Sequence, residues 1–423
     1  MWLLTILHRW LGVVMGLFFA MWFFSGMVMM YVPFPSLPDG ERLKHLAPID
    51  TQEITVSPEA AIAACGSDRV NGLRMITFDA RPTYVCAHAD ASVELVHADS
   101  GTPAVSLDES AVRAFARQHL AAPIAHVVEV EFDQWTVHQR FNSLRPLYRI
   151  ELEDSLQTHL YLSSLTGEAI QRTTGQQRFW NYLGAVVHWV YPTILRKHWA
   201  AWDAVVWWLS LFGVVCAVLG LVLGLSHWIK LRRAGRVGLT PFRGWMKWHH
   251  VLSLFIGLFV VSWIVSGWLS MDHGRLFSTP NPTPDLALNV QGGEFAEVVA
   301  SLNTQAFARY KSPRELTLSA FGGNALVVAK DETGVVDTPE ISPQRIADVV
   351  ARAASDGIAD WRVVPDDDLY TSLREGSLPT GTVRVALADP NQTWIHIDRY
   401  SGHIISVMDS SRRLYRWLYN GLH

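Results

Sequence analysis

Histidines beside long apolar segments are the residues of this sequence that could do chemistry. His8 precedes the first apolar segment, His249 precedes the third, and His227 ends the second. His188 and His423 each end an aromatic stretch, FWNYLGAVVH and LYRWLYNGLH. Ionisable side chains at a membrane segment are costly and indicate function, and neutral imidazole is a common metal ligand. These five histidines are the candidate ligands.

Three apolar segments must position these histidines. A membrane helix needs about 20 apolar residues, and three longer stretches carry no charge: Trp10–Pro38, Ala204–Ser226 and Val251–Met271. We predict spanning helices within 1–33, 201–229 and 248–272, the first too long to be a signal-peptide core. Hydrophobic residues make up 49% of the chain and charged residues 17%, which indicates a membrane protein in contact with the lipid bilayer.

The orientation of these helices follows from one basic loop. Residues 230–247 contain no acid and carry six cations, namely Lys230, Arg232, Arg233, Arg236, Arg243 and Lys247. Because positive loops stay in the cytoplasm, the polar stretches 34–177 and 273–411 are expected on the outer side. Residues 178–200 and 412–423 are predicted to be interfacial aromatic segments. The net charge of −4 gives no reason to expect nucleic acid binding.

Two cysteines fall in the first outer stretch. Cys65 and Cys86 could form a disulfide in an oxidising compartment, and two unpaired, partly buried thiols are the alternative. Cys216 lies inside the second apolar segment, where it is most simply a small apolar residue.

The chain contains an internal repeat. Residues His8, Gly16, Ser25 and Gly26 recur 241 positions later as His249, Gly257, Ser266 and Gly267. THLYLSSLTGEAI at 158–170 matches TWIHIDRYSGHII at 393–405, 235 positions later, and the same displacement relates His188 to His423. Both helices of the pair are predicted to point outward. We therefore predict a parallel duplication about an axis along the membrane normal.

The outer stretches have an α+β pattern. SPEAAIAAC, DESAVRAFARQHL and SPQRIADVVARAA are typical of short helices that begin at a Ser or Asp cap. Alternating runs around a Gly turn follow them and indicate antiparallel strands. We predict small α+β modules that serve as scaffold.

Several features in this order resemble the PepSY-associated transmembrane family, which includes iron-regulated membrane proteins and ferric-siderophore reductases. They are the HRWLG…SG entry helix, the LTGE and YSGH turns, the RLYRWLYNGLH segment and the basic loop. The resemblance implies a membrane α-helical bundle with two periplasmic α+β PepSY-like domains in the bacterial inner membrane. It also implies b-type haem. The family has a further spanning helix after the last segment, whereas this sequence stops at His423. Either the polypeptide is shortened or the last helix is missing.

We predict two haem b groups, each between two histidines. His8 with His249 forms the inner pair, and His188 with His423 forms the outer pair; His227 competes with His249 as the partner of His8. Two axial histidines leave no open position on the iron, which favours electron transfer. His250, His198 and His273 are expected to be interfacial. Small residues allow close approach in membrane helices, a role expected of Gly12, Gly16, Gly26, Gly257 and Gly267.

Other cofactor signatures are missing from the sequence. It contains no G-x-G-x-x-G after a strand, no P-loop and no C-x-x-C-H, so the electron donor is unidentified. Cations expected on the outer side could bind an anionic ferric chelate or simply meet lipid phosphates: Arg145, Arg149, Arg196, Lys197 and Arg275, among Trp135, Tyr148, Tyr191 and Trp199.

The resulting hypothesis is a ferric-siderophore or ferric-chelate reductase, an oxidoreductase that moves electrons outward across the membrane. Two alternatives remain. One is a non-catalytic membrane protein whose outer domains bind a protein partner. The other is a haem-bearing subunit of another redox enzyme.

Overall fold

The computed structural model describes residues 2–66, 70–273, 284–365, 367–368 and 378–422. The chain forms two compact units. The helical unit comprises Met1–Phe34, Gln177–Thr279 and Ser411–His423, and the sheet unit comprises Pro35–Gln176 and Pro280–Ser410.

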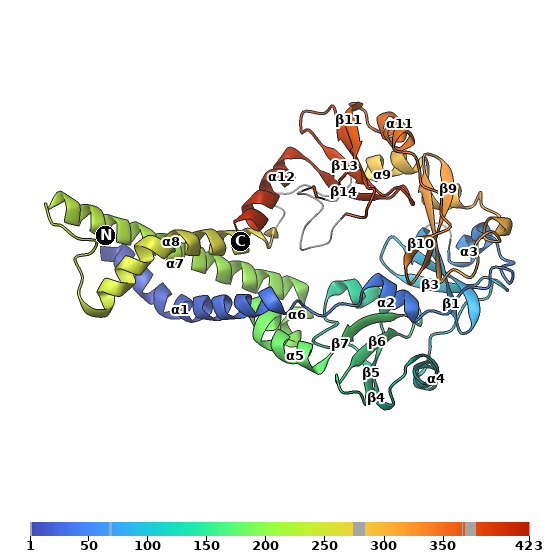
Figure 1. Ribbon diagram of the computed structural model, residues 1–423, viewed down its shortest axis with the longest axis horizontal. Coiled ribbons are helices and arrows are strands. Elements are labelled where there is room, and N and C mark those ends of the chain that lie inside the picture. The colour runs from blue at the N-terminus through green and yellow to red at the C-terminus, as the bar shows by residue number, and fades with distance from the viewer. Residues whose placement is uncertain (1, 67–69, 274–283, 366, 369–377, 423) are drawn as a thin grey trace. The chain divides into compact units, whose positions relative to one another are not determined.

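Three long helices form the helical unit: α1 (Trp2–Tyr31), α7 (Trp199–Arg233) and α8 (Gly244–Leu269). Within the described residues these are the helices long and apolar enough to cross a membrane. Both α1 and α8 pack against α7 (Figure 1). The three long apolar helices predicted from the sequence are thus present, and each could span a membrane. Helix α7 extends beyond its predicted end and carries three cations in its last turn, where they interact favourably with the helix dipole.

Short helices in the two aromatic segments share an unusual feature. Helix α5 (Gly175–Asn181) continues into a π-helix, η3 (Tyr182–Val186), and α6 (Thr193–Arg196) follows. Helix α12 (Ser410–Arg416) likewise continues into a π-helix, η6 (Trp417–Gly421), placed 235 residues after η3. Because π-helical turns are rare overall but occur often at functional sites, both segments are candidate sites.

A six-stranded antiparallel sheet lies at the centre of the sheet unit, with the order β10-β9-β8-β1-β2-β3. Its strands are β1 (Val70–Phe78), β2 (Arg81–His88), β3 (Val93–His97), β8 (Glu315–Phe321), β9 (Asn324–Asp331) and β10 (Gly334–Val336). The two outer stretches, 34–177 and 273–411, therefore contribute three strands each to one sheet. The two central strands, β1 and β8, pair antiparallel with Arg74 opposite Thr317. Each strand ends four residues after this pair, β1 at Phe78 and β8 at Phe321.

Two four-stranded sheets complete this unit, with the orders β4-β5-β6-β7 and β11-β12-β13-β14. Their strands are β4 (Ile124–Val130), β5 (Leu147–Leu152), β6 (His159–Ser163), β7 (Ala169–Thr173), β11 (Ile358–Val363), β12 (Val383–Leu387), β13 (Trp394–Ile397) and β14 (Ile404–Met408). An eleven-residue helix precedes each sheet: α4 (Glu109–His119) and α11 (Pro343–Ala353). The first strand of each sheet has a register shift just after its first residue, Ile124 or Ile358.

Each of the two sheets also contains an Arg–Asp ion pair that is at least partly buried. Arg149 on β5 binds Asp133 at 2.7 Å, and Arg384 on β12 binds Asp368 at 2.8 Å. Both members of the second pair lie 235 positions after those of the first. The α+β modules predicted from the sequence are present. The two four-stranded modules match in helix length, strand order, the position of the register shift and the ion pair.

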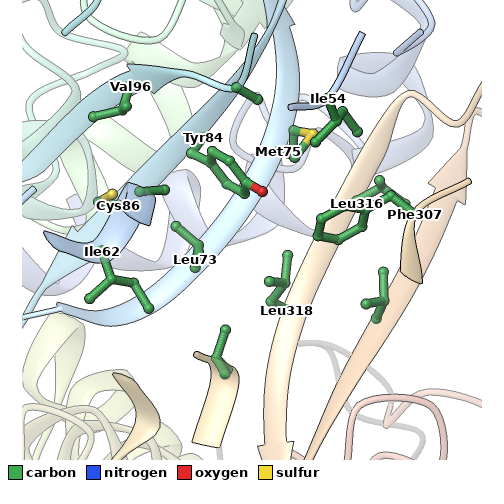
Figure 2. Close-up of a cluster of buried hydrophobic side chains, with 14 of the residues drawn as sticks. Ile54, Ile62, Leu73, Met75, Tyr84, Cys86, Val96, Phe307, Leu316 and Leu318 are labelled. Carbon is green, nitrogen blue, oxygen red and sulfur yellow. The ribbon is translucent and has the colours of Figure 1, made fainter. Parts of the chain in front are cut away.

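The core of the six-stranded sheet draws on both outer stretches. Leu73 and Tyr84 pack with Phe307 and Leu316 in one cluster (Figure 2). Side chains of α3 (Pro58–Ala64) and α10 (Phe295–Val299) join it. The remaining short elements are α2 (Asp39–Lys44), η2 (Gln139–Leu144), α9 (Pro284–Gln291) and η5 (Thr304–Ala306). A disulfide joins Cys65 to Cys86 beside this core, which decides the alternative that the sequence left open.

A buried charge network lies between the six-stranded sheet and the first four-stranded sheet. Glu168, 3% exposed, accepts a 2.8 Å hydrogen bond from Nη1 of Arg74 and a 2.6 Å bond from Nη1 of Arg42. Burial opposes ionisation of Glu168, but attraction to Arg74 and the hydrogen bonds outweigh it and lower the pKa of Glu168 to about 2. Glu315 binds Arg42 at 2.9 Å and completes the network.

Candidate functional site

His8 is held in one orientation by helix α7. Its Nδ1 lies 3.1 Å from the backbone oxygen of Cys216, so a protonated Nδ1 donates to this carbonyl and Nε2 is the nitrogen that could bind a metal. The ring packs on Gly220, where an added β-carbon would lie 2.7 Å from Cε1 of His8. The close packing of the His8 ring therefore depends on glycine at position 220.

His249 on α8 lies beside His8 on α1. The centroids of the two rings are 6.4 Å apart and their planes are inclined at 36°. Two imidazoles that share one metal, each at a metal–nitrogen distance of about 2.0 Å, have ring centres about 6 Å apart. The structure thus brings the predicted inner pair together at a spacing that suits a single metal between the rings.

A second histidine pair lies close to the loop that connects α7 and α8. The rings of His227 and His250 are 6.3 Å apart, and Phe242 contacts both. His227 Nδ1 lies 2.7 Å from the oxygen of Leu223, and His250 Nε2 lies 3.0 Å from that of Gly224. His250 is 5% exposed, so its predicted interfacial position is wrong: the ring packs inward on the backbone of α7.

His188 follows the π-helix η3 and contacts α1. Its Nδ1 lies 3.1 Å from the backbone oxygen of Trp22 and 3.1 Å from Oγ of Ser25. The indole of Trp22 donates to the backbone oxygen of His188 at 3.0 Å. A β-carbon at Gly26 would lie 3.3 Å from Cε1 of His188. Its predicted partner, His423, lies outside the described residues.

The contacts of His188 reveal a motif that the sequence repeat had only half indicated. Trp22, Ser25 and Gly26 hold His188, and a W-x-x-S-G pattern recurs on α8 at 263–267. The repeated Ser-Gly was part of the predicted duplication, but the tryptophan was missed. The signal was available, since Trp22 and Trp263 are also 241 positions apart.

The two histidine sites lie near opposite ends of the bundle. His8 and Ser25 are 17 residues apart on α1, which corresponds to about 26 Å along a helix. The hydrocarbon core of a bilayer is about 30 Å thick. A group bound at each site would therefore lie near each face of a membrane that the bundle spans.

The glycines that matter for packing differ in part from those predicted. Added β-carbons at Gly12 and Gly16 meet no described atom within 4 Å, and one at Gly257 makes ordinary contact. Gly26 does admit a histidine, as expected. Close approaches between segments of the bundle occur at Gly220 and at Gly184, where an added β-carbon would lie 3.0 Å from Val28.

The cations proposed for an acceptor have different surroundings. In the sheet unit, Arg145 donates to the backbone oxygens of Glu131 and Thr136, and Arg149 binds Asp133. These two guanidinium groups already bind protein oxygens. In the helical unit, Arg196 is buried among aromatic rings. Lys197 is exposed, and Arg275 lies outside the described residues.

The two histidines expected at the outer rim differ from each other. His198 is exposed, as an interfacial residue would be. His273 instead pairs with Asp203 of α7 through Nδ1, and its ring lies 5.1 Å from that of Trp207. An acid within the first turns of a spanning helix thus has a polar partner, as expected for a carboxylate near a membrane.

Three apolar helices, histidines near both ends and a β-sheet unit define a multi-pass membrane protein with a large non-membrane part. The chain belongs to the PepSY-associated TM family, because the family model described as PepSY-associated TM region matches residues 5–330. This confirms the family suggested by the sequence motifs. Comparisons with curated proteins and with solved structures gave no match.

Proposed function

We propose that this protein is a b-type haem electron carrier that passes electrons outward across a bacterial inner membrane to a ferric chelate such as a ferric siderophore. The observation that carries the proposal is the pair His8 and His249, whose ring centres are 6.4 Å apart on two different membrane helices. When bound, haem supplies a one-electron couple, and two axial histidines suit electron transfer.

The residues at the inner site fit haem in their chemistry. Nε2 of His8 and a ring nitrogen of His249 are the proposed ligands. The carbonyl of Cys216 fixes the tautomer and orientation of His8, which is the role that outer-shell hydrogen bonds play at metal sites. Gly220 gives the ring room against α7.

A second haem is proposed at His188 with His423. The carbonyl of Trp22 orients His188 as that of Cys216 orients His8, and the preceding π-helix offsets this segment from ordinary helical register. Two such groups near opposite ends of α1 would form an electron path through the bilayer.

Internal duplication and outer placement of the sheet unit are part of the same proposal. The matched sheet orders, the repeated Asp–Arg pair and the two π-helices support duplication. Antiparallel pairing of β1 with β8 about Arg74 and Thr317 is what a two-fold relation between the halves would give. The Cys65–Cys86 disulfide supports an oxidising compartment for the sheet unit.

Transfer of one electron would release iron from the acceptor. Fe(III) in a chelate is held by hard oxygen donors, and reduction to Fe(II) weakens that hold. The step moves one electron from the carrier to the chelated iron, and it needs no proton from the protein. The electron donor on the inner side remains unassigned.

Absorbance spectra of the purified protein test this proposal. After expression with sufficient haem, the dithionite-reduced protein is expected to show a b-type spectrum. His8→Ala and His249→Ala should each lose about half of the bound haem, whereas His119→Ala, an exposed histidine of α4, should lose none. Rapid reoxidation of the reduced protein by a ferric chelate would distinguish a reductase from a haem subunit of another enzyme.

Two results would contradict the proposal in different ways. A colourless wild-type protein would remove the haem and favour a module that binds a protein partner. Unchanged haem in both His8→Ala and His249→Ala, with loss in His227→Ala, would refute the proposed inner pair.

A further inference from the structure

Arg196 is a buried cation in the helical unit. It follows the aromatic segment that carries His188 and precedes the first residue of α7 by three positions. Its side chain is 2% exposed. Nε and Nη1 are shielded from solvent and have no hydrogen-bond acceptor among the described residues.

Aromatic rings surround this guanidinium group. Cζ of Arg196 lies 4.6 Å from the ring centres of Trp199 and Trp202, and 5.0 Å from that of Tyr191. The indole of Trp202 is fixed by hydrogen bonds of 3.0 and 3.1 Å to the backbone oxygens of Trp189 and Val190. The three rings form a box around the guanidinium group, and one of its walls, Trp202, is hydrogen-bonded to Trp189, the residue next to His188.

The backbone beside this box is strained. Val190 has φ of +49°, a left-handed conformation that is unfavourable for a β-branched residue. Strain of this kind persists where the surroundings impose it, and it is concentrated at ligand-binding and catalytic sites. The strained peptide supplies the carbonyl that positions Trp202.

Within the part of the chain that the structure describes, no anion enters this box. The faces of aromatic rings stabilise a guanidinium group by cation–π contact. The N–H groups of the guanidinium still require hydrogen-bond acceptors, and an unpaired buried charge is costly. Asp203, the nearest acid along the chain, is paired with His273. The neighbours Lys197 and His198 add no negative charge. An oxyanion from outside the described chain would satisfy Arg196.

We propose that Arg196 binds a carboxylate of a haem ligated by His188, and this inference rests on the proposed function. A haem carries two propionate groups that require cationic or hydrogen-bonding partners. Arg196 is close to the segment that carries His188, because Trp202, which packs on Arg196, donates to the backbone oxygens of Trp189 and Val190. Nε and Nη1 of Arg196 are shielded from solvent. This favours a ligand held inside the bundle over a lipid headgroup at its surface.

The test compares haem with haem dimethyl ester, in which both carboxylates are capped. Titration of the full-length apoprotein with each compound gives affinities for wild type, Arg196→Gln and Arg196→Lys. The wild type should bind the ester about tenfold or more weakly than haem at one site, because a charge-assisted hydrogen bond is lost. Arg196→Gln should bind both compounds equally at that site, and Arg196→Lys should fall between. Arg140→Gln, an exposed arginine stacked on Phe141, is the control and should match wild type.

The outcomes separate this inference from the proposed function. If wild type binds no haem, the proposed function fails. If wild type binds haem and the ester equally, or Arg196→Gln weakens both by the same factor, the carboxylate contact is refuted and Arg196 has a structural role. A phosphorus assay of the same samples provides a further check: loss of a bound phospholipid in Arg196→Gln, with the haem-to-ester ratio unchanged, would assign the residue to a lipid phosphate and overturn the inference.

Discussion

Replacement of Gly220 by alanine is expected to displace His8 and empty the inner haem site. The added β-carbon would lie 2.7 Å from Cε1, 3.3 Å from Nε2 and 3.4 Å from Nδ1 of His8. Carbon atoms pack at about 3.5–4.0 Å, so the ring must move by about 1 Å. Protein–metal distances tolerate about 0.2 Å, and the required movement is several times larger.

Stability should change much less than haem content. Overpacking costs about 1–3 kcal/mol, but alanine is favoured over glycine in a helix by about 1 kcal/mol. The free energy of unfolding should therefore fall by about 2 kcal/mol or less. Haem affinity at the inner site should fall by about tenfold or more, as for other changes that disturb the support of a metal ligand.

Haem content of purified protein, measured per polypeptide, is the assay. Gly220→Ala should contain about half the haem of wild type. Gly16→Ala is the matched control, since it lies on α1 as His8 does and its added β-carbon meets no described atom within 4 Å. It should keep full haem. Full haem with an unshifted spectrum in Gly220→Ala would refute the reasoning, because the ring would then have no need of the space that glycine provides.

Three further changes test the sheet unit, each followed by tryptophan fluorescence during urea unfolding of the full chain. Glu168→Gln should lower the free energy of unfolding by about 3 kcal/mol near neutral pH, because Arg74 loses its buried partner. Since the pKa of Glu168 is about 2 and its ordinary value about 4.3, its ionic contribution is present above about pH 4.3 and is lost as the pH falls toward 2. The difference from wild type should shrink over that range; a difference independent of pH would contradict this. Cys65→Ser should cost about 3 kcal/mol, because the disulfide closes a loop of 21 residues, and dithiothreitol should abolish the difference from wild type. Gly402→Ala should cost more than Gly357→Ala: both glycines have φ near +70°, but only at position 402 would the β-carbon overlap a ring, that of Phe321. Equal costs would show that backbone strain alone is responsible.

The hydrophobicity of the sequence was enough to predict the apolar helices. It was not enough to predict how these helices pack against one another. A run of uncharged residues must be placed in lipid as a helix, so α1, α7 and α8 were predictable within a few residues. Which glycine admits a histidine depends on how two helices cross. Gly12 and Gly16 are near His8 in sequence and were expected to matter, yet Gly220, far away in the chain, makes the contact.

For the histidines, too, the sequence predicted one feature and only the structure showed the other. The 241-residue displacement matches His8 with His249 through spacing along the chain alone, and the two rings do lie 6.4 Å apart. The burial of His250 was not foreseen, because two adjacent histidines look alike in the sequence and only the position of α7 decides that His250 packs on its backbone.

The sequence by itself predicted three long apolar helices, which the described residues contain, the family, and the histidines near the helix ends. All of these follow from local composition and from spacing along the chain. Only the tertiary structure decided that both outer stretches share one sheet, that Cys65 bonds Cys86, and that Arg196 is buried without an anion among the described residues. These features depend on contacts between segments that are distant in sequence, and such contacts are selected by packing of the whole fold, which no local pattern encodes.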